Sequence, residues 1–389
     1  MRTLDQMYAS HRMIGMTHPQ SWRAVFLIMW AVLFTSCGGG NNATSTNPTG
    51  QPGGSARHAY VSNYGGGSGQ TLTGFAVSST NGNLLPFDLS ALKVPPGPLT
   101  LGTDGQGKFV YVGSQGGLIS AYSYSPLDGG LTQIGGSPYG AGQQVTFLTI
   151  DSSSKYVFSV DNTLSTIWPF TISATTGALT PIASTSKVPA YGVTPNPPLT
   201  ATVDPFVHYL YVAMGSAGTE VFQISNSGLL DAGTILAMGG ANAEFIAIER
   251  TGRFAYVADG TSGIATYFID PSTGNLVALA PTPVPTGSKP NRIILTPDSK
   301  YMYVINQGDG TVSQFALNPN GGLTSIGTNL ACGIQPATGT VDAGGTFLYV
   351  VNQGSASVSI FRISAIDGTL TAQAPASSGP SPSSIVVVP

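Results

Sequence analysis

Short segments in which apolar residues alternate with small or polar residues recur from residue 58 to the end of the chain. Gly, Pro, Asn and Asp, which favour turns, separate these segments. A period of two residues, with turns between short segments, is typical of β-strands and not of helices. One stretch contains four such segments, at residues 292–295, 301–305, 311–317 and 323–326. The pattern therefore predicts groups of four short strands.

Two motifs repeat seven times along this part of the chain. The first is a strand that begins with an aromatic residue, followed by Val in all copies but the third: Tyr60, Tyr111, Phe158, Tyr211, Tyr256, Tyr303 and Tyr349. The second is a Gly-containing turn that ends in Leu, at Leu84, Leu131, Leu179, Leu229, Leu276, Leu323 and Leu370. Successive leucines are 47, 48, 50, 47, 47 and 47 residues apart. Seven repeats of four strands predict an all-β fold, a seven-bladed β-propeller with four antiparallel strands in each blade; six or eight blades are the alternatives.

The two ends of the repeat region complement each other. The first repeat begins at His58 and lacks a first strand, whereas residues 382–388 look like a first strand without the rest of its blade. Residues 290–294 begin the sixth repeat in the same way. The C-terminal strand is therefore expected to join the first blade and close the ring, which leaves no open sheet edge. The predicted propeller covers residues 57–389.

An apolar run of 11 residues, 24–34, lies before the propeller. It is too short to cross a bilayer and has the length of a signal-peptide core. Small residues then lead to Cys37, and this arrangement resembles a bacterial lipoprotein signal, although Phe34 stands where that signal prefers Leu. The resemblance implies a signal peptide over residues 1–36 and a lipid on Cys37; an ordinary secretory signal cut nearby is the alternative. The start residue is open between Met1, Met13 and Met16.

Residues 37–56 are polar and rich in Gly, Ser, Thr, Asn and Pro. A segment of this composition cannot bury a core, so we expect a flexible tether. With a lipid on Cys37, the tether predicts an extracytoplasmic domain held at a bacterial membrane, in the periplasm or on the cell surface.

Charged residues make up 8% of the 389-residue chain, against roughly 25% in an average globular protein. Only 14 residues are Lys or Arg. Residues 1–36 contain three of these and one acidic residue, so the remainder has 11 basic and 16 acidic residues and a net charge of −5. This balance argues against binding to nucleic acid, and against membrane contact other than through Cys37.

Few residues of the mature chain suit acid–base or metal chemistry. Its histidines are His58, where the tether meets the first blade, and His208, in a turn before a strand, and both are interpreted as structural. Cys332 has no disulfide partner if Cys37 carries a lipid, and it is interpreted as a buried or turn residue rather than a nucleophile. No His/Cys cluster and no closely spaced carboxylates form a metal motif, so neither a metal nor a cofactor is expected.

Glu244 is the best candidate for a catalytic base or a ligand, because it begins a first strand, where a propeller's central channel opens. Arg292 begins the next first strand and could bind a carboxylate; alternatively, the two side chains pair with each other or with water and have no further role. Asn291, Gln307 and Gln353 are further polar candidates for ligand binding. Other acidic residues recur between the first and second strands and are interpreted as turn-forming: Asp104, Asp151, Asp204, Glu249, Asp298 and Asp342.

The seven blades, the Tyr-Val-x-Asn strand, the Asp-Gly-x-Leu turn and the Pro-x-x-Ile first strand together resemble the lactonase-type seven-bladed propellers. This family of 6-phosphogluconolactonases also contains a carboxymuconate-cyclising branch and surface proteins with YVTN repeats. Its catalytic members often have Pro-Arg-His at the start of a first strand and Asn-Glu after the second. Here the sixth repeat has Pro290-Asn291-Arg292 and Asn306-Gln307, and the seventh has Pro336-Ala337-Thr338 and Asn352-Gln353.

Two functions follow from these observations. The resemblance implies hydrolysis of a small lactone at the channel mouth, with Glu244 and Arg292 closest to the reaction. A phosphorylated sugar lactone is not expected, because the channel offers few cations. The replacement of the family's His and Glu favours the alternative, a non-catalytic propeller that binds a glycan or a protein at the cell surface. In either case we expect a monomer.

Overall fold

A computed structural model describes residues 57–65, 72–182, 186–187, 197–236, 242–261 and 263–388, with residues 186–187 described by their backbone alone. These residues form β-strands and turns, and among them no helix is long and apolar enough to span a membrane. The predicted signal peptide, the lipidated Cys37 and the tether lie outside the described residues and stay predictions.

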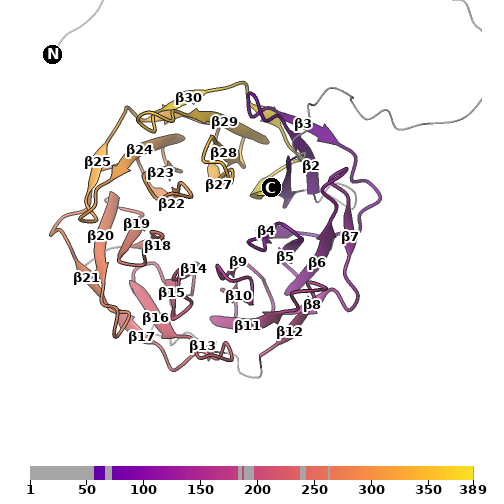
Figure 1. The fold of residues 1–389 in the computed structure, drawn as a ribbon, viewed down its shortest axis with the longest axis horizontal. Coiled ribbons are helices and arrows are strands. Elements are labelled where there is room, and N and C mark those ends of the chain that lie inside the picture. The colour runs from indigo at the N-terminus through magenta and orange to yellow at the C-terminus, as the bar shows by residue number, and fades with distance from the viewer. Residues whose placement is uncertain are drawn as a thin grey trace, which may run out of the picture. The chain divides into compact units, whose positions relative to one another are not determined.

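Seven antiparallel sheets surround a common axis, which confirms the predicted seven-bladed propeller with four strands in each blade (Figure 1). We number the blades 1 to 7 along the chain. The innermost strands are β32 (Pro382–Val388), β4 (Pro98–Thr103), β9 (Phe147–Ile150), β14 (Thr200–Val203), β18 (Ala243–Ile248), β22 (Pro290–Leu295) and β27 (Pro336–Val341). The second strands are β1 (Arg57–Asn63), β5 (Phe109–Ser114), β10 (Tyr156–Asp161), β15 (Tyr209–Ala213), β19 (Phe254–Asp259), β23 (Tyr301–Asn306) and β28 (Phe347–Asn352).

The outer half of each blade is made of a third and a fourth strand. The third strands are β2 (Leu72–Val77), β6 (Leu118–Tyr124), β11 (Thr166–Ile172), β16 (Thr219–Gln223), β20 (Gly263–Ile269), β24 (Thr311–Leu317) and β29 (Ser357–Ile363). The fourth strands are β3 (Leu84–Phe87), β7 (Leu131–Gln133), β12 (Leu179–Pro181), β17 (Thr234–Leu236), β21 (Leu276–Ala278), β25 (Leu323–Ser325) and β30 (Leu370–Ala372). Four short strands pair with third strands: β8 (Tyr139–Gly140), β13 (Ser186–Lys187), β26 (Leu330–Ala331) and β31 (Ala376–Ser377).

The C-terminal strand β32 joins blade 1, as the sequence predicted (Figure 1). It pairs antiparallel with β1, and His58 lies opposite Val388. Its side chains pack into both flanking seams: Val386 and Val388 belong to the buried cluster between blades 1 and 2, and Ile385 to the cluster between blades 7 and 1. The ring is therefore closed by a strand from the far end of the chain.

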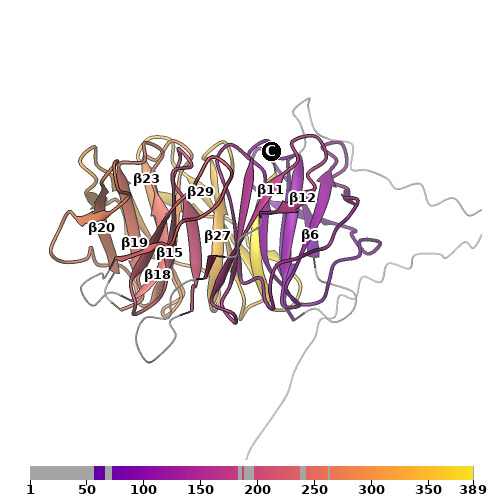
Figure 2. The same cartoon turned by 90° about the horizontal axis from the view of Figure 1, so that it is seen from below.

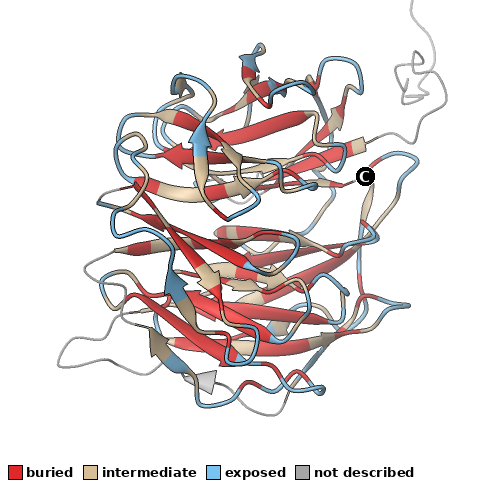
Figure 3. Ribbon diagram, turned by 60° about the vertical axis from the view of Figure 1, so that its left-hand side comes forward, coloured by how far each residue is buried: buried red, intermediate tan, exposed pale blue. Residues whose placement is uncertain are grey.

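The core lies in the seams between neighbouring sheets. Buried residues concentrate in the strands and exposed residues in the connecting turns (Figure 3). All six residues of β5 are buried, because this second strand has a sheet against each of its faces. Successive side chains point to opposite faces of a strand. Tyr111 therefore packs with residues of blade 3, and Val112 with residues of blade 1.

The innermost strands run in one direction, so the two faces of the ring differ. Figure 2 shows the ring from the side, with connecting turns on both faces. Between the neighbouring strands β14 and β18, Thr200 Oγ1 donates to the carbonyl of Glu244 (3.1 Å) and Thr202 Oγ1 to the carbonyl of Ile246 (2.6 Å), as expected for a parallel course. We call the face where the innermost strands begin the upstream face, and the face where they end the downstream face. The turns between first and second strands, and between third and fourth strands, lie on the downstream face.

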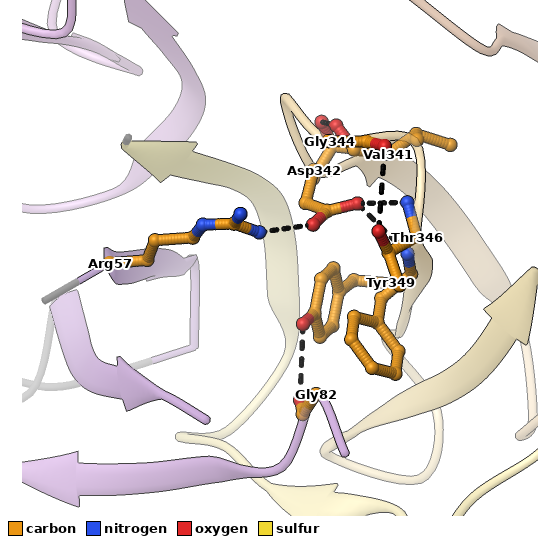
Figure 4. Close-up of polar contacts among 9 residues, drawn as sticks. Arg57, Gly82, Val341, Asp342, Gly344, Thr346 and Tyr349 are labelled. Carbon is orange, nitrogen blue, oxygen red and sulfur yellow. Dashed lines mark hydrogen bonds and ion pairs between the residues drawn. The ribbon is translucent and has the colours of Figure 1, made fainter. Parts of the chain in front are cut away.

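The two repeated motifs meet across the seams between blades. Tyr303, in a second strand, donates its hydroxyl hydrogen bond to the carbonyl of the turn glycine Gly368 in the following blade (2.7 Å). Tyr349 and Gly82 form the same bond (3.1 Å), which links blade 7 to blade 1 (Figure 4). Gly368 has a φ of 74°, a conformation that favours glycine. In five of the seven seams of the described structure, the aromatic motif and the glycine motif therefore supply each other's hydrogen-bond partner.

Blade 3 departs from this arrangement in a compensated way. It has Phe158 where the other blades have tyrosine. Tyr156, two residues earlier, donates its hydroxyl to the carbonyl of Asn226 in blade 4 instead (2.7 Å). The seam between blades 3 and 4 therefore keeps a tyrosine-to-carbonyl bond although the motif differs.

We expect Tyr349→Phe to lower the free energy of unfolding by about 1–2 kcal/mol, because the buried carbonyl of Gly82 loses this partner. Chemical denaturation of the purified protein measures the change. Tyr64→Phe is the control, since Tyr64 is 40% exposed and a surface substitution changes stability by about 0.5 kcal/mol or less. Equal losses in the two variants would contradict a specific role of the hydroxyl.

A buried carboxylate organises the turn between first and second strands in most blades. Asp342 Oδ1 accepts hydrogen bonds from the backbone N–H groups of Thr346 (2.6 Å) and Phe347 (2.8 Å), and its other oxygen pairs with Arg57 Nη1 (2.5 Å) from blade 1 (Figure 4). The equivalent carboxylates are Asp104, Asp151, Asp204 and Glu249. These residues are turn-forming, as the sequence predicted.

Blade 6 also has an acidic residue in this turn, Asp298, which accepts the N–H of Lys300 (3.2 Å), but it stands at a different position. Thr296, and not Asp298, occupies the equivalent position, and its Oγ1 accepts the hydrogen bond from the N–H of Tyr301 (3.1 Å). Asp298 lies two residues further on and forms an ion pair with Lys300 (3.2 Å). The sequence alone did not reveal that Thr296 takes the place of the acidic residue, because Thr296 and Asp298 are both small polar residues in the same turn.

Candidate functional site

A β-bulge at the start of several innermost strands changes the direction in which their first side chains point. Each of these strands has one extra residue relative to its neighbour, which is Glu244 in β18 and Asn291 in β22. Bulges bend the strand and redirect neighbouring side chains, and they are common beside functional sites. Phe245 and Arg292, the residues that follow, then occupy equivalent positions in their blades. The two predicted catalytic residues therefore come from adjacent blades but not from the same position of the repeat. Glu244 is the bulge residue of its strand, whereas Arg292 follows the bulge residue of the next blade.

The position of Arg292 forms a ring of seven residues near the upstream face, one from each innermost strand: Ser384, Thr100, Phe147, Thr200, Phe245, Arg292 and Thr338. The three long side chains meet one another. The guanidinium carbon of Arg292 lies 5.6 Å from the ring centre of Phe245 and 6.0 Å from that of Phe147. The two aromatic rings are 6.0 Å apart and nearly perpendicular. Because Phe147 belongs to blade 3 and Arg292 to blade 6, this contact is made across the axis of the ring.

Arg292 remains charged although it lies deep among protein atoms. Burial lowers the pKa of its guanidinium to about 10, and the negative charge of Glu244 opposes this shift. Its Nη1 donates to the carbonyl of Asn291 (2.8 Å), but among the described residues its Nε has no hydrogen-bond partner. The side-chain oxygen of Asn291 has none there either. Buried polar atoms are almost always hydrogen-bonded, so an unpartnered donor and acceptor on consecutive residues suit a bound molecule.

Glu244 is held by its own blade. Its Oε1 accepts a hydrogen bond from Asn242 Nδ2 (2.6 Å), and Gly260 leaves room for the side chain, since a Cβ there would lie 3.0 Å from that oxygen. No ion pair joins Glu244 to Arg292 in the part of the chain that the structure describes, so the alternative in which the two residues pair is not formed. Glu244 therefore keeps its second carboxylate oxygen available to a ligand or a water molecule.

The two glutamines lie at the same face but away from this cluster. Gln307 is exposed and Gln353 is partly exposed, each just after the end of a second strand. Their backbone N–H groups donate to the carbonyls of Lys289 and Gln335, both at 2.9 Å. Among the described residues no contact joins either glutamine side chain to Arg292, so as ligand residues both stay predictions.

Sequence reasoning did not identify Asn242, Phe147 or Phe245 as members of the site. Nothing in the sequence marked Asn242 as a site residue, because a single asparagine before a strand is common. The two phenylalanines could have been recognised, because they stand at a repeat position that holds Ser or Thr in four of the other five blades. A comparison of the seven first strands in register would have found them, but the bulges obscure that register in the sequence.

The two histidines and Cys332 have surroundings that fit a structural role. His58 is buried, its Nδ1 lies 2.8 Å from the hydroxyl of Tyr124, and burial lowers its pKa. His208 is an exposed turn residue. The thiol of Cys332 donates to the carbonyl of Gly310 (3.1 Å), and burial raises its pKa to about 11, which disfavours the reactive thiolate. Within the described ranges, no three His, Cys, Asp or Glu side chains are placed to hold a metal ion.

Residues 58–387 match the family model described as lactonase, seven-bladed β-propeller. A candidate 6-phosphogluconolactonase from Bacteroides fragilis is 21% identical, with a TM-score of 0.73, over 86% of this chain and 98% of the other. The periplasmic gluconolactonase of Pseudomonas aeruginosa is 20% identical, with a TM-score of 0.73, over 86% and 99%. A protein from Lactobacillus plantarum is 21% identical, with a TM-score of 0.74, over 86% and 100%. At these identities the likeness shows the fold alone. No curated protein matches the sequence.

Proposed function

The chain belongs to the lactonase family of seven-bladed β-propellers, and on this basis we propose that it hydrolyses a small hydroxylated lactone at the axis of its upstream face. The residues proposed to act are Arg292, Glu244 and Asn291. The gluconolactonase name of the Pseudomonas aeruginosa neighbour supports the substrate class, and the side chains at the axis support the place.

The observation that carries the proposal is a pair of unpartnered polar atoms on consecutive residues. Among the described residues, Arg292 Nε is a donor without an acceptor, and Asn291 Oδ1 is an acceptor without a donor. A ligand that satisfies both must present an acceptor and a hydroxyl or amine donor. A lactone that carries a hydroxyl group has both, in its carbonyl oxygen and in that hydroxyl.

The proposed reaction follows from the charges of the two catalytic candidates. Glu244 takes a proton from a water molecule, whose oxygen adds to the lactone carbonyl carbon. Arg292 stabilises the negative charge that develops on the carbonyl oxygen. The ring C–O bond then breaks, the proton passes from Glu244 to the departing ring oxygen, and a hydroxy acid leaves the site. Phe147 and Phe245 lie next to each other against the guanidinium and help to hold it in place.

We expect purified protein to open glucono-δ-lactone or a related hydroxylated lactone, with proton release followed in a pH-stat. Glu244→Gln and Arg292→Met should each lower kcat/KM by about 100-fold or more, because each removes a group that acts on the transition state. Lys155→Met is the control, since Lys155 is an exposed cation on the downstream face and should leave kcat/KM unchanged. Equal turnover in all variants would place the chemistry elsewhere.

A second function, binding without hydrolysis, is favoured by one feature of the site. None of the seven residues in the ring of Arg292 is histidine, the residue that the family's catalytic members often carry there. Under this alternative the same atoms bind a small carbonyl compound that is released unchanged. Calorimetry that detects binding of a lactone without proton release over hours would support binding and overturn hydrolysis.

A further inference from the structure

Three clefts open side by side on the downstream face, opposite the proposed lactone site. They lie between blades 4 and 5 (about 270 Å³), blades 5 and 6 (about 640 Å³) and blades 6 and 7 (about 330 Å³). The first two share Phe206, Thr251 and Arg253, and the last two share Asp298 and Lys300. Neighbouring clefts therefore adjoin each other, and we call the three together the downstream groove. A groove that crosses three seams suits an extended ligand rather than a single small molecule.

Basic side chains gather in this groove although they are rare in the chain. Arg250 and Arg253 flank the same turn of blade 5, both are exposed, and Lys300 lies on the next blade. In the described structure no hydrogen bond or ion pair engages the guanidinium of Arg250 or Arg253. Arg253 stacks over the ring of Phe254, 4.9 Å from its centre, which leaves the edge of the guanidinium open. Two planar groups with free N–H donors are suited to bind carboxylates in a bidentate manner.

The acidic residues of the groove accept no hydrogen bond from the guanidinium groups of Arg250 and Arg253 in the described structure. Glu249 is buried and accepts the backbone N–H groups of Thr251 (2.7 Å) and Arg253 (2.8 Å). Asp204 is buried and organises its own turn in the same way, and Asp298 pairs with Lys300. These three carboxylates balance the formal charges of Arg250, Arg253 and Lys300, so the groove has no net positive charge. Recognition here must therefore rest on short, directed hydrogen bonds from the two arginines.

An exposed aromatic ring lies where the first two clefts meet. Phe206 is 60% exposed, and His208 stacks against it with 6.2 Å between ring centres and 30° between planes. Gly252, with a φ of 68°, lies against the ring, and a Cβ there would come within 2.9 Å of it. The ring is thus fixed in position and still presents apolar surface to solvent. The apolar C–H face of a pyranose ring matches such a surface.

We propose that the downstream groove binds an acidic oligosaccharide, a chain of uronate sugars, with carboxylates on Arg250 and Arg253 and one sugar ring on Phe206. Carboxylates that alternate with flat ring faces along a chain fit this order of guanidinium groups and an aromatic ring. An acidic peptide supplies carboxylates but no flat saturated ring for Phe206. The site is separate from the lactone site, so it does not depend on the proposed hydrolysis.

The test is calorimetric titration of the protein with a hexamer of galacturonate. We expect binding, and a loss of about tenfold or more in affinity for Arg250→Gln, Arg253→Gln and Phe206→Ser. Lys155→Gln is the matched control: Lys155 holds the equivalent turn position in blade 3, with its Nζ 4.8 Å from the Tyr156 ring centre, but lies outside the groove. It should bind as the unmodified protein does.

Several results would overturn the proposal. One is the absence of binding up to about 1 mM hexamer. Equal binding of a neutral glucose hexamer would show that the arginines do not recognise carboxylates. Equal binding of hexaglutamate would show that the groove binds acidic peptides instead. A tenfold loss in Lys155→Gln would show an effect of general charge. Thermal melting of each variant verifies folding, and Arg292→Met should bind the hexamer normally even if no lactone is hydrolysed.

Discussion

Removal of residues 382–389 is expected to abolish the folded propeller. Ile385, Val386 and Val388 are at most 9% exposed, and they fill seams on both sides of blade 1. Burial of each such side chain contributes roughly 1.5–3 kcal/mol, while a whole domain has a net stability of only about 5–15 kcal/mol. The truncated chain would also expose the edge of β1, which invites aggregation. Circular dichroism should show no cooperative thermal transition, and size exclusion should show aggregates.

A circular permutant separates the loss of the strand from the position of the chain ends. It joins Val388 to Arg57 through a short turn and begins after Thr328, in the connection between β25 and β26. All strands are kept, so we expect cooperative melting within a few degrees of the unpermuted protein. A truncated chain that melts at the temperature of the full chain would show that β32 does not close the ring.

Glu220→Gln is expected to remove a large pH dependence of stability. Glu220 lies in β16 and is fully buried, and neither carboxylate oxygen has a hydrogen-bond partner in the described structure. Burial raises its pKa to about 8, and the charge of nearby Asp231 adds to the shift. The corresponding residue in blades 2, 6 and 7 is a serine, namely Ser120, Ser313 and Ser359.

The sign of the effect follows from where the proton is bound. Below the unfolded pKa of 4.5 Glu220 is protonated in both states, and its contribution to stability is fully present. Between pH 4.5 and about 8 the unfolded chain releases the proton while the folded protein keeps it. Stability then falls by about 1.4 kcal/mol per pH unit, at most about 5 kcal/mol in total. Above the folded pKa both states are ionised and the loss is complete.

Urea denaturation at pH 5, 6.5 and 8.5 measures this dependence. Relative to the unmodified protein, Glu220→Gln should gain several kcal/mol between the lowest and the highest pH, because the glutamine has no proton to lose. Comparison of the two proteins at each pH cancels the contribution of His58, whose lowered pKa acts in the opposite direction. Glu220→Ser, which restores the residue of three other blades, should remove the dependence as well. Parallel pH curves for all three proteins would refute the assignment.

The sequence predicted the architecture because its repeats carry the information locally. The aromatic motif and the turn glycine occur in every blade, and in five of the seven seams the structure shows a hydrogen bond between them, as between Tyr303 and Gly368. The missing first strand at His58 and the isolated strand at residues 382–388 predicted the closure for the same reason. Residues that pack the blades repeat along the chain, so they can be recognised from the sequence without a structure.

The site could be predicted only in part. Glu244 and Arg292 stood out because charged residues are rare at the start of first strands. The contact of Arg292 with Phe147 could not be predicted from the sequence, since 144 residues, including the whole of blades 4 and 5, lie between them. The bulges at Glu244 and Asn291 also shift the repeat by one residue, which a comparison of unaligned motifs does not reveal.

By itself, the sequence determined the number of blades, their strands and the way in which the ring closes, because those features depend on alternation and turn chemistry within about 47 residues. Only the tertiary structure decided which side chains meet at the axis, which carboxylates are already satisfied by turns, and that Glu220 is buried without a partner. These depend on distances between blades, and such distances are set by the packing of whole sheets rather than by any one repeat.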